Sequence, residues 1–258
     1  MITLVKQETF KLLHKKSTYA VSATLLIIMT IFGVLTRNYP KYWGDPKGMF
    51  VEMFTGINWI VLFLIAACSS IIAMEFQYGT IKELLYRKYY RGQILVSKWI
   101  TMLLYSIYFF ALCFVWSMLL KVVLFNDKFK LTDTFQSGYS VIETQWLGIV
   151  GSFLTIWLVL SLVLLLANIF KSTAAAISIG IIGYFALSII SNVMFLLMHR
   201  WEWLKWNPLN MMNLSQQLVS SSIHKMTLLS TPEMVIGSLV YTAIFMAISY
   251  VVFKRRSV

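Results

Sequence analysis

Few residues in this sequence have types and spacing that could do chemistry, and their pattern favours docking over catalysis. An apolar run ends at Glu75, Gly79 interrupts it, and the chain continues Thr80-Ile81-Lys82-Glu83-Leu84-Leu85. Thr80 and Glu83 are spaced as a capping box, in which each side chain accepts a hydrogen bond from the other residue's backbone N–H. The cap predicts a short helix whose apolar ridge consists of Ile81, Leu84 and Leu85. Such a helix suits a groove on a partner protein, although a loop on lipid headgroups would explain the nearby basic residues equally well.

Motifs for catalysis or metal binding are missing from the sequence. It contains neither G-x-x-x-x-G-K-[ST] nor H-E-x-x-H. The three histidines do not cluster, because His14 is expected on the opposite side of the membrane from His199 and His224, which stand 25 residues apart. Cys68 and Cys113 lie inside apolar runs and are expected to be small buried hydrophobic residues. The apolar runs also lack the paired carboxylates that proton-coupled transport or an aspartyl protease would need. We therefore expect no catalytic site, metal site or cofactor in this chain.

The elements that must position these residues follow from the composition. The chain has 258 residues, of which 59% are hydrophobic and 12% are charged, whereas about 25% of residues are charged in an average soluble domain. Uncharged windows cover Ser17–Thr36, Met53–Met74, Trp99–Leu120, Thr144–Phe170, Ser172–Met198 and Met234–Phe253. Each window holds the roughly 20 residues that a helix needs to cross a hydrocarbon core of about 30 Å. The sequence thus predicts an all-α membrane protein with six transmembrane helices.

We expect a single transmembrane domain over residues 1–258. The predicted elements are an interfacial helix at 1–17, transmembrane helices at 18–37, 53–75, 96–124, 145–170, 173–198 and 234–253, a coupling helix at 79–90 and an outer segment at 199–232. The first window is long for the core of a signal peptide and lacks an Ala-x-Ala-like end, so we expect it to be retained. Neutral amides within the spans, at Asn58, Asn168 and Asn192, are expected to form hydrogen bonds between helices.

Lysine and arginine positions predict the orientation. With both termini inside, the inner segments carry 13 of the 22 basic residues and three of the ten acidic ones, so their net charge is 13 − 3 = +10. The outer segments carry the rest, a net charge of 9 − 7 = +2. The positive-inside rule therefore places both termini in the cytoplasm. The overall charge of +12 is explained by anionic lipid at the inner leaflet and calls for no nucleic acid.

Two flanking segments have patterns typical of a membrane surface. Phe10, Leu12 and Leu13 contribute to an apolar side of residues 2–17, which predicts an amphipathic helix lying on the inner surface and not a simple extension of the first span. On the outer side, Trp203 and Trp206 precede Pro208, and tryptophan is enriched at membrane interfaces. We expect the following residues to re-enter the outer leaflet as a short helix, the alternative being an ordinary loop with an aromatic anchor.

The segment after the second window resembles the signature of ABC-2 permeases, the six-helix transmembrane subunits of ATP-binding-cassette exporters. It reads E-F-Q-Y-G-T-I-K-E-L-L-Y-R…R-G-Q-I-L-V-S-K, and the resemblance extends to L-V-K-Q-E-T-F-K-L-L-H-K-K before the first span and to the number of spans. The sequence departs from the pattern at Tyr86–Tyr90, where a proline or serine often precedes the arginine. Within that family, the sequence is similar to permeases for export of, or immunity to, bacteriocins and antibiotic peptides.

This resemblance implies a permease that is not itself an enzyme and that works in the plasma membrane of a bacterium. Two ATPase subunits would bind ATP and Mg²⁺, and a second permease copy or a related permease would complete the path. The cargo is expected to be a peptide or another amphipathic molecule, the alternatives being a lipid, a small-molecule antibiotic, or no transport at all in a scaffold or sensor. The ATPase-coupling residues would be Glu75, Gly79, Thr80, Ile81, Glu83, Leu84, Leu85 and Arg91.

Overall fold

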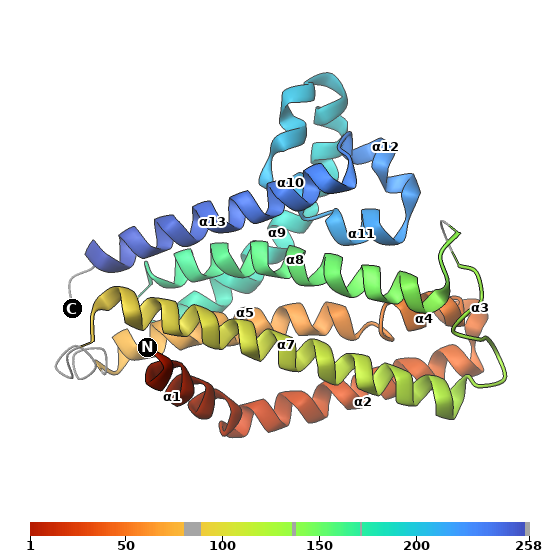
Figure 1. The fold of residues 1–258 in the computed structure, drawn as a ribbon, viewed down its shortest axis with the longest axis horizontal. Helices are drawn as coiled ribbons and strands as arrows, with labels where there is room; N and C mark the ends of the chain where they lie inside the picture. The colour runs from red at the N-terminus through yellow and green to blue at the C-terminus, as the bar shows by residue number, and fades with distance from the viewer. Residues whose placement is uncertain (80–88, 136–137, 171, 256–258) are drawn as a thin grey trace.

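The computed structural model describes residues 1–79, 89–135, 138–170 and 172–255 (Figure 1). Within these ranges the chain is helical and contains no named strand. Six helices are long and apolar enough to cross a membrane. The predicted fold class is confirmed, and the chain is an all-α, multi-pass membrane protein.

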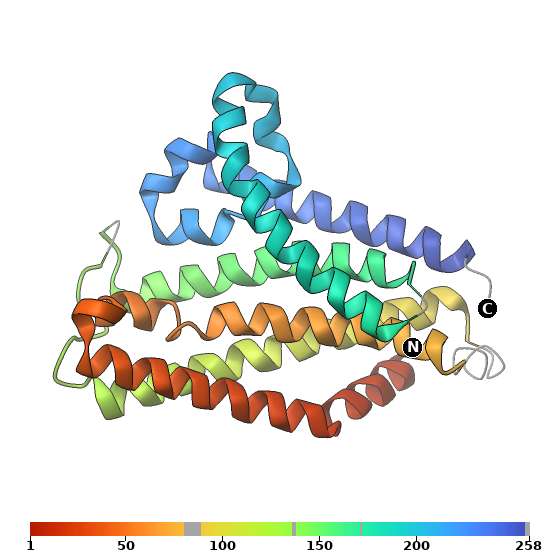
Figure 2. The ribbon, with the colours of Figure 1, turned by 180° about the vertical axis from the view of Figure 1, so that it is seen from behind.

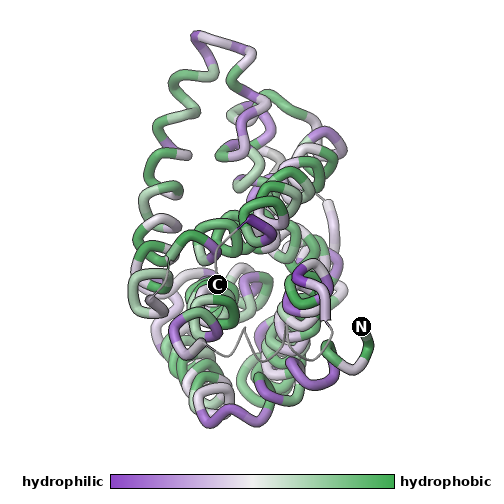
Figure 3. The backbone as a smooth tube through the Cα atoms, turned by 90° about the vertical axis from the view of Figure 1, so that its left-hand side faces the viewer, coloured by the Kyte–Doolittle hydropathy of each residue, from purple (hydrophilic) through white to green (hydrophobic). Residues whose placement is uncertain are grey.

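The spans form an elongated bundle. They are α2 (Lys16–Asn38), α5 (Gly56–Gln77), α7 (Arg91–Leu124), α8 (Val141–Ala167), α9 (Thr173–Arg200) and α13 (Thr231–Arg255). Five of them run roughly along the long axis, whereas α9 crosses obliquely behind α5 and α8 (Figures 1 and 2). The start of α1 and the end of α13 lie at the same end of the bundle (Figure 1). Viewed from that end, hydrophobic residues occupy most of the helix lengths and hydrophilic residues gather in the turns (Figure 3).

Helices α5 and α8 form the centre of the bundle. In the apolar window of α8 56% of the residues are buried, against 11% in α9, so α9 is the span that packs least against the rest of the chain. Where α9 meets α5, a β-carbon on Gly180 would lie 2.8 Å from Ile65 Cγ2, and Ala176, one turn earlier, is buried. Small residues at this spacing thus allow the close approach of two helices.

Short helices flank the spans. They are α1 (Ile2–Leu13), α3 (Pro40–Trp43), α4 (Pro46–Val51), η2 (Glu202–Trp206), α10 (Pro208–Met211), α11 (Leu214–Val219), η3 (Ser221–Ile223) and α12 (His224–Thr227). A capping box that we did not predict begins α8, because the Ser140 N–H donates to Glu143 Oε2 at 2.8 Å and the Glu143 N–H donates to Ser140 Oγ at 3.3 Å. Cys68 and Cys113 are buried free thiols.

Several element boundaries differ from the expected ones, among them those of the fourth transmembrane helix, which spans Val141–Ala167 and not 145–170. The second transmembrane helix starts at Gly56 and not at residue 53, because Met53, Phe54 and Thr55 all have positive φ angles of 48–60°. The third starts at Arg91 and not at residue 96, so that two basic residues, Arg91 and Lys98, stand in its first turns. The predicted coupling helix at 79–90 falls mainly on residues 80–88, which lie outside the described residues.

The outer segment turns back along α8. Helix α11 packs so closely on α8 that a β-carbon on Gly151 would lie 2.8 Å from Ser215 Cα and 2.7 Å from Leu218 Cδ1. Gly151 lies about 15 Å along the helix axis from the first residue of α8, at a rise of about 1.5 Å per residue. The end of α11 is therefore beside the body of the bundle, whereas η2 projects away from it (Figure 1).

Candidate functional site

A buried lysine joins three helices at the end of the bundle where the chain begins. Lys98 of α7 is 1% exposed, and its Nζ atom lies 2.7 Å from Glu75 Oε1 of α5 and 2.9 Å from Glu8 Oε2 of α1. Lys11, one turn after Glu8, lies 2.9 Å from the other Glu8 oxygen. We call Glu8, Glu75 and Lys98 the charge cluster.

Local sequence explains how each member reaches the cluster. Leu4, Glu8 and Leu12 recur every four residues, so they share one face of α1, and all three are buried where α1 packs on α7. Glu75 stands in the last turn of α5, where the negative end of the helix dipole disfavours a carboxylate. The ammonium of Lys98 offsets that unfavourable position.

The cluster is electrically balanced only if Lys11 is counted. Burial opposes ionisation of Glu8, but the charges and hydrogen bonds of Lys98 and Lys11 outweigh burial and hold the pKa of Glu8 below its ordinary value. Lys11 is 62% exposed and Lys98 is 1% exposed. Solvent screens the Lys11 pair, so Lys98 carries most of the attraction that keeps both carboxylates buried.

Replacement of Glu8 is expected to destabilise the protein most at pH values above the range in which the Glu8 carboxyl group titrates. Because the folded pKa of Glu8 is lowered, its stabilisation is fully present above the unfolded pKa of about 4.3 and is lost as pH falls through the folded pKa. In detergent, Glu8→Gln should therefore melt below the wild type at pH 7, and the two melting temperatures should converge on acidification. Glu202→Gln, which changes an exposed carboxylate, is the control. A gap between wild type and Glu8→Gln that is constant with pH would contradict this role of Glu8.

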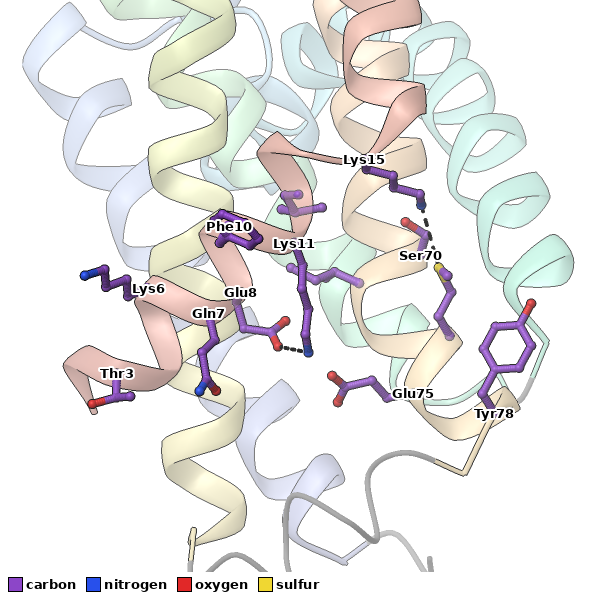
Figure 4. Close-up of a pocket in the computed structure, with 13 residues that line it drawn as sticks. Thr3, Lys6, Gln7, Glu8, Phe10, Lys11, Lys15, Ser70, Glu75 and Tyr78 are labelled. Atoms are coloured by element: carbon purple, nitrogen blue, oxygen red, sulfur yellow. Dashed lines mark hydrogen bonds and ion pairs between the residues drawn. The ribbon is translucent and has the colours of Figure 1, made fainter.

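An amphipathic cleft of about 880 Å³ opens beside the cluster, between α1 and the end of α5 (Figure 4). Its basic residues are Lys6, Lys11 and Lys15, and its apolar wall includes Ile71 and Met74. Glu75 also lines the cleft, and its Oε2 atom is buried without a hydrogen-bond partner among the described residues. The two carboxylates of the cluster thus border the cleft, next to the point where α5 ends.

The structure describes three of the eight predicted coupling residues. Glu75 is in the cluster, and Gly79 follows α5 with a φ of 69°, in the left-handed region that favours glycine. Arg91 begins α7 and donates from Nη1 to the Lys254 carbonyl at 3.1 Å, which joins α7 to the end of α13. The remaining five, Thr80, Ile81, Glu83, Leu84 and Leu85, lie outside the described residues.

The predicted interfacial and outer residues are spread around the molecule. On α1, Leu12 is buried and Leu13 packs against the core, whereas Phe10 is 61% exposed. The face of α1 that packs on the bundle is therefore not the whole apolar side expected from the sequence. Trp203 and Trp206 are exposed in η2, and Pro208 is the first residue of α10.

Sequence reasoning missed Glu8 and Lys98 as partners of Glu75. A signal for Lys98 was its place inside α7, next to an otherwise uncharged apolar run, because a charge there requires a partner. Glu8 is one of only three acidic residues assigned to the inner segments, and Lys98 is one of 13 basic ones. Their pairing depends on the packing of α1 on α7, which the sequence pattern does not reveal.

The amides expected to join helices behave differently from one another. Asn168, at the end of α8, donates to Ser249 Oγ of α13 at 2.7 Å, as expected. Asn192 donates within α9, to the Ser188 carbonyl at 3.0 Å. Asn58 is exposed and lines a second cleft at the other end of the bundle.

Comparison with known proteins places the chain in a family. Residues 26–258 match the family described as Protein of unknown function (DUF2705). The chain is also 26% identical over 205 residues to a protein of Bacillus subtilis (strain 168) that carries the name Uncharacterized protein YhcI. That similarity covers 76% of this chain and 64% of the relative, so the chain spans less than two thirds of the relative's length. Because the family match covers well over half of its residues, the chain belongs to the DUF2705 family.

Proposed function

We propose that this chain is the transmembrane permease subunit of an ATP-binding-cassette exporter for peptides or other amphipathic molecules. The proposal is supported by the resemblance of residues 75–98 to the ABC-2 signature and by six helices of membrane-spanning length. The chain supplies the path, and separate ATPase subunits supply the energy. A second copy or a related permease completes the path.

The observation that carries this proposal is the position of the charge cluster. Glu75 lies two residues before the end of α5, and the proposed coupling segment follows between α5 and α7. Because Lys98 contacts Glu75 and Glu8 at 2.7 and 2.9 Å, a displacement of either end of that segment is transmitted to α1 as well. Contacts of this kind would allow closure of the ATPases to move α1, α5 and α7 together.

The proposed orientation places the charge cluster at the cytoplasmic face of a bacterial cell membrane. Six spans bring the start of α1 and the end of α13 to one end of the bundle (Figure 1), and the charge asymmetry of +10 against +2 favours the cytoplasm for that end. The cluster and the coupling segment would then face ATPases in the cytosol. ATP and Mg²⁺ would be held by those subunits.

Loss of the apolar ridge that the sequence predicts at Ile81, Leu84 and Leu85 is expected to separate the permease from its ATPase. Leu84→Asp or Leu85→Asp should insert normally in the membrane but fail to retain an ABC ATPase encoded beside it, because a charge cannot be buried in an apolar groove without a partner. Co-purification from mild detergent measures the retention. Tyr42→Asp is the control, since Tyr42 is 82% exposed at the opposite end of the bundle.

Wild-type retention of the ATPase by both leucine variants would show that the contact lies elsewhere. Purification of the wild type with a kinase, or with no partner from cells that express the ATPase, would favour a sensor or scaffold. With the complex in hand, stimulation of ATP hydrolysis by amphipathic peptides tests the cargo class. No response to peptides, with a response to lipids, would point to lipid export.

A further inference from the structure

A second cleft, of about 500 Å³, lies at the end of the bundle away from the charge cluster. It is bordered by the junction of α4 and α5, by α8 and by α11. Helix α5 alone has 22 residues and is about 33 Å long, enough to cross the hydrocarbon core. A span formed by α5 alone would place the α4–α5 junction and this cleft at the membrane boundary opposite the charge cluster.

An unusual stretch of backbone lies between two of the segments that line the cleft, Val51–Glu52 and Ile57–Asn58. Met53, Phe54 and Thr55 have φ angles of 48°, 48° and 60°, and the left-handed region costs about 1–2 kcal/mol for each residue that is not glycine. The fully buried side chains of Met53 and Phe54 hold the break in place. Gln145 of α8 contributes as well, because its Nε2 donates to the Phe50 carbonyl at 2.9 Å.

The break ends α4 at Val51 and places Glu52 on the wall of the cleft. Strained backbone of this kind is concentrated at ligand sites, and interrupted membrane helices supply binding groups in transporters. Glu52 is the one ionisable residue among those that line the cleft. Among the described residues no lysine, arginine or histidine forms an ion pair with it, and nearby Lys47 is paired with Asp133 at 3.2 Å.

The other residues that line the cleft suit a ligand that carries a primary ammonium group on an apolar chain. Ser152 and Ser215 line the same cleft as Glu52 and offer hydroxyl acceptors, and Phe135 offers an aromatic ring of the kind that attracts cations. Apolar surface for the adjoining chain comes from Ile57 and Val219. The volume is at the lower part of the range for ligand pockets, about 300–1,000 Å³, so the cleft holds a side chain and its neighbours and not a whole peptide.

We propose that this cleft binds the lysine ammonium of a cationic amphipathic peptide, with Glu52 as its counter-ion. An aminophospholipid is disfavoured because its phosphate would lie near Glu52, and no cationic residue lines the described cleft to hold it. Binding requires neither ATP nor an ATPase, so the inference goes beyond the proposed function. The inference rests on the proposed function in one respect, because that function identifies the bound peptide as the transported cargo.

The test uses the full chain in phosphatidylcholine nanodiscs, where the lipid has no primary amine. The probe is an amphipathic peptide with one lysine among leucines and a fluorophore on its blocked N-terminus, compared with the same peptide carrying acetyl-lysine. Fluorescence anisotropy should show the lysine peptide binding at least about tenfold more tightly, since hydrogen bonds to charged groups are the stronger ones. Glu52→Gln should abolish the preference, and Glu202→Gln, an exposed carboxylate outside the cleft, should keep it.

A second measurement on the wild type avoids any question of folding. A hydrophobic carbodiimide should modify Glu52, as detected by mass spectrometry, and the lysine peptide should protect it while the acetyl-lysine peptide should not. Equal affinity for the two peptides, a preference that survives Glu52→Gln, or labelling that saturating lysine peptide leaves unchanged would overturn the assignment. Displacement of the lysine peptide by phosphatidylethanolamine would also overturn it, in favour of a lipid. None of these results bears on ATPase retention, which tests the proposed function separately.

Discussion

Lys98→Met is expected to lower the free energy of unfolding by about 3–5 kcal/mol, because it leaves two buried carboxylates without their cation. Lys98 is 1% exposed, and its Nζ atom lies within 2.9 Å of both Glu8 and Glu75. In the wild type the Lys98 ammonium lies between the two carboxylates. In the variant these carboxylates would repel each other, and this repulsion adds to the cost of their burial. The variant should melt well below the wild type in detergent micelles at pH 7.

Lys11→Met is the matched control for this experiment. Lys11 pairs with the same Glu8 at the same distance of 2.9 Å, but it is 62% exposed, and exposed ion pairs contribute about 1 kcal/mol or less. The triple variant Lys98→Met, Glu8→Gln, Glu75→Gln removes all three charges and should recover much of the loss. Equal melting temperatures for Lys98→Met and Lys11→Met would show that the cluster does not hold α1, α5 and α7 together.

Gly151→Leu is expected to displace α11 from α8 and to destabilise the protein by about 1–3 kcal/mol or more, as overpacking does. The β-carbon alone would lie 2.8 Å from Ser215 Cα. Since that contact is with backbone, a rotamer change cannot relieve it, and the rest of the leucine side chain has no space. Thermal melting measures the loss, and faster proteolysis after Lys225 would report release of the outer segment.

Gly183→Leu provides the comparison, because a β-carbon at Gly183 would meet no heavy atom within 4 Å. Gly183 also lies within a long helix, α9, where replacing glycine tends to stabilise the helix by up to about 1 kcal/mol. The two glycine variants should thus change the melting temperature in opposite directions, or by very different amounts. If both melted like the wild type, the close packing of α11 on α8 would be refuted.

The spans could be predicted from the sequence because lipid imposes a simple condition on them. A charge at the centre of a membrane helix costs about 2.5–3.5 kcal/mol on insertion scales, so uncharged windows mark the helices whatever their neighbours are. The position of Glu75 at the end of the second span follows from the same rule. Its pairing with Lys98 and Glu8 does not, because contacts between helices depend on how the helices pack.

The break at Met53–Thr55 shows a second limit of prediction from sequence. None of the three residues is a glycine or proline, the usual markers of an interrupted helix, and the stretch M-F-T continues an apolar run. The conformation is held instead by burial of Met53 and Phe54 and by Gln145, 90 positions or more along the chain. Glu52, the residue that this break leaves on the wall of the second cleft, was for that reason not among the predicted site residues.

The sharing of one ammonium by two carboxylates also limits how these positions can change as the family diverges. A neutral residue at position 98 leaves two uncompensated acids, and a neutral residue at position 8 or 75 leaves the lysine with one partner in place of two. Loss of the lysine is therefore the costly step, and it is tolerated only after the carboxylates have changed. Lineages that abandon this arrangement would have to replace the carboxylates before the lysine, so the fates of the three positions are linked although they lie in three different helices.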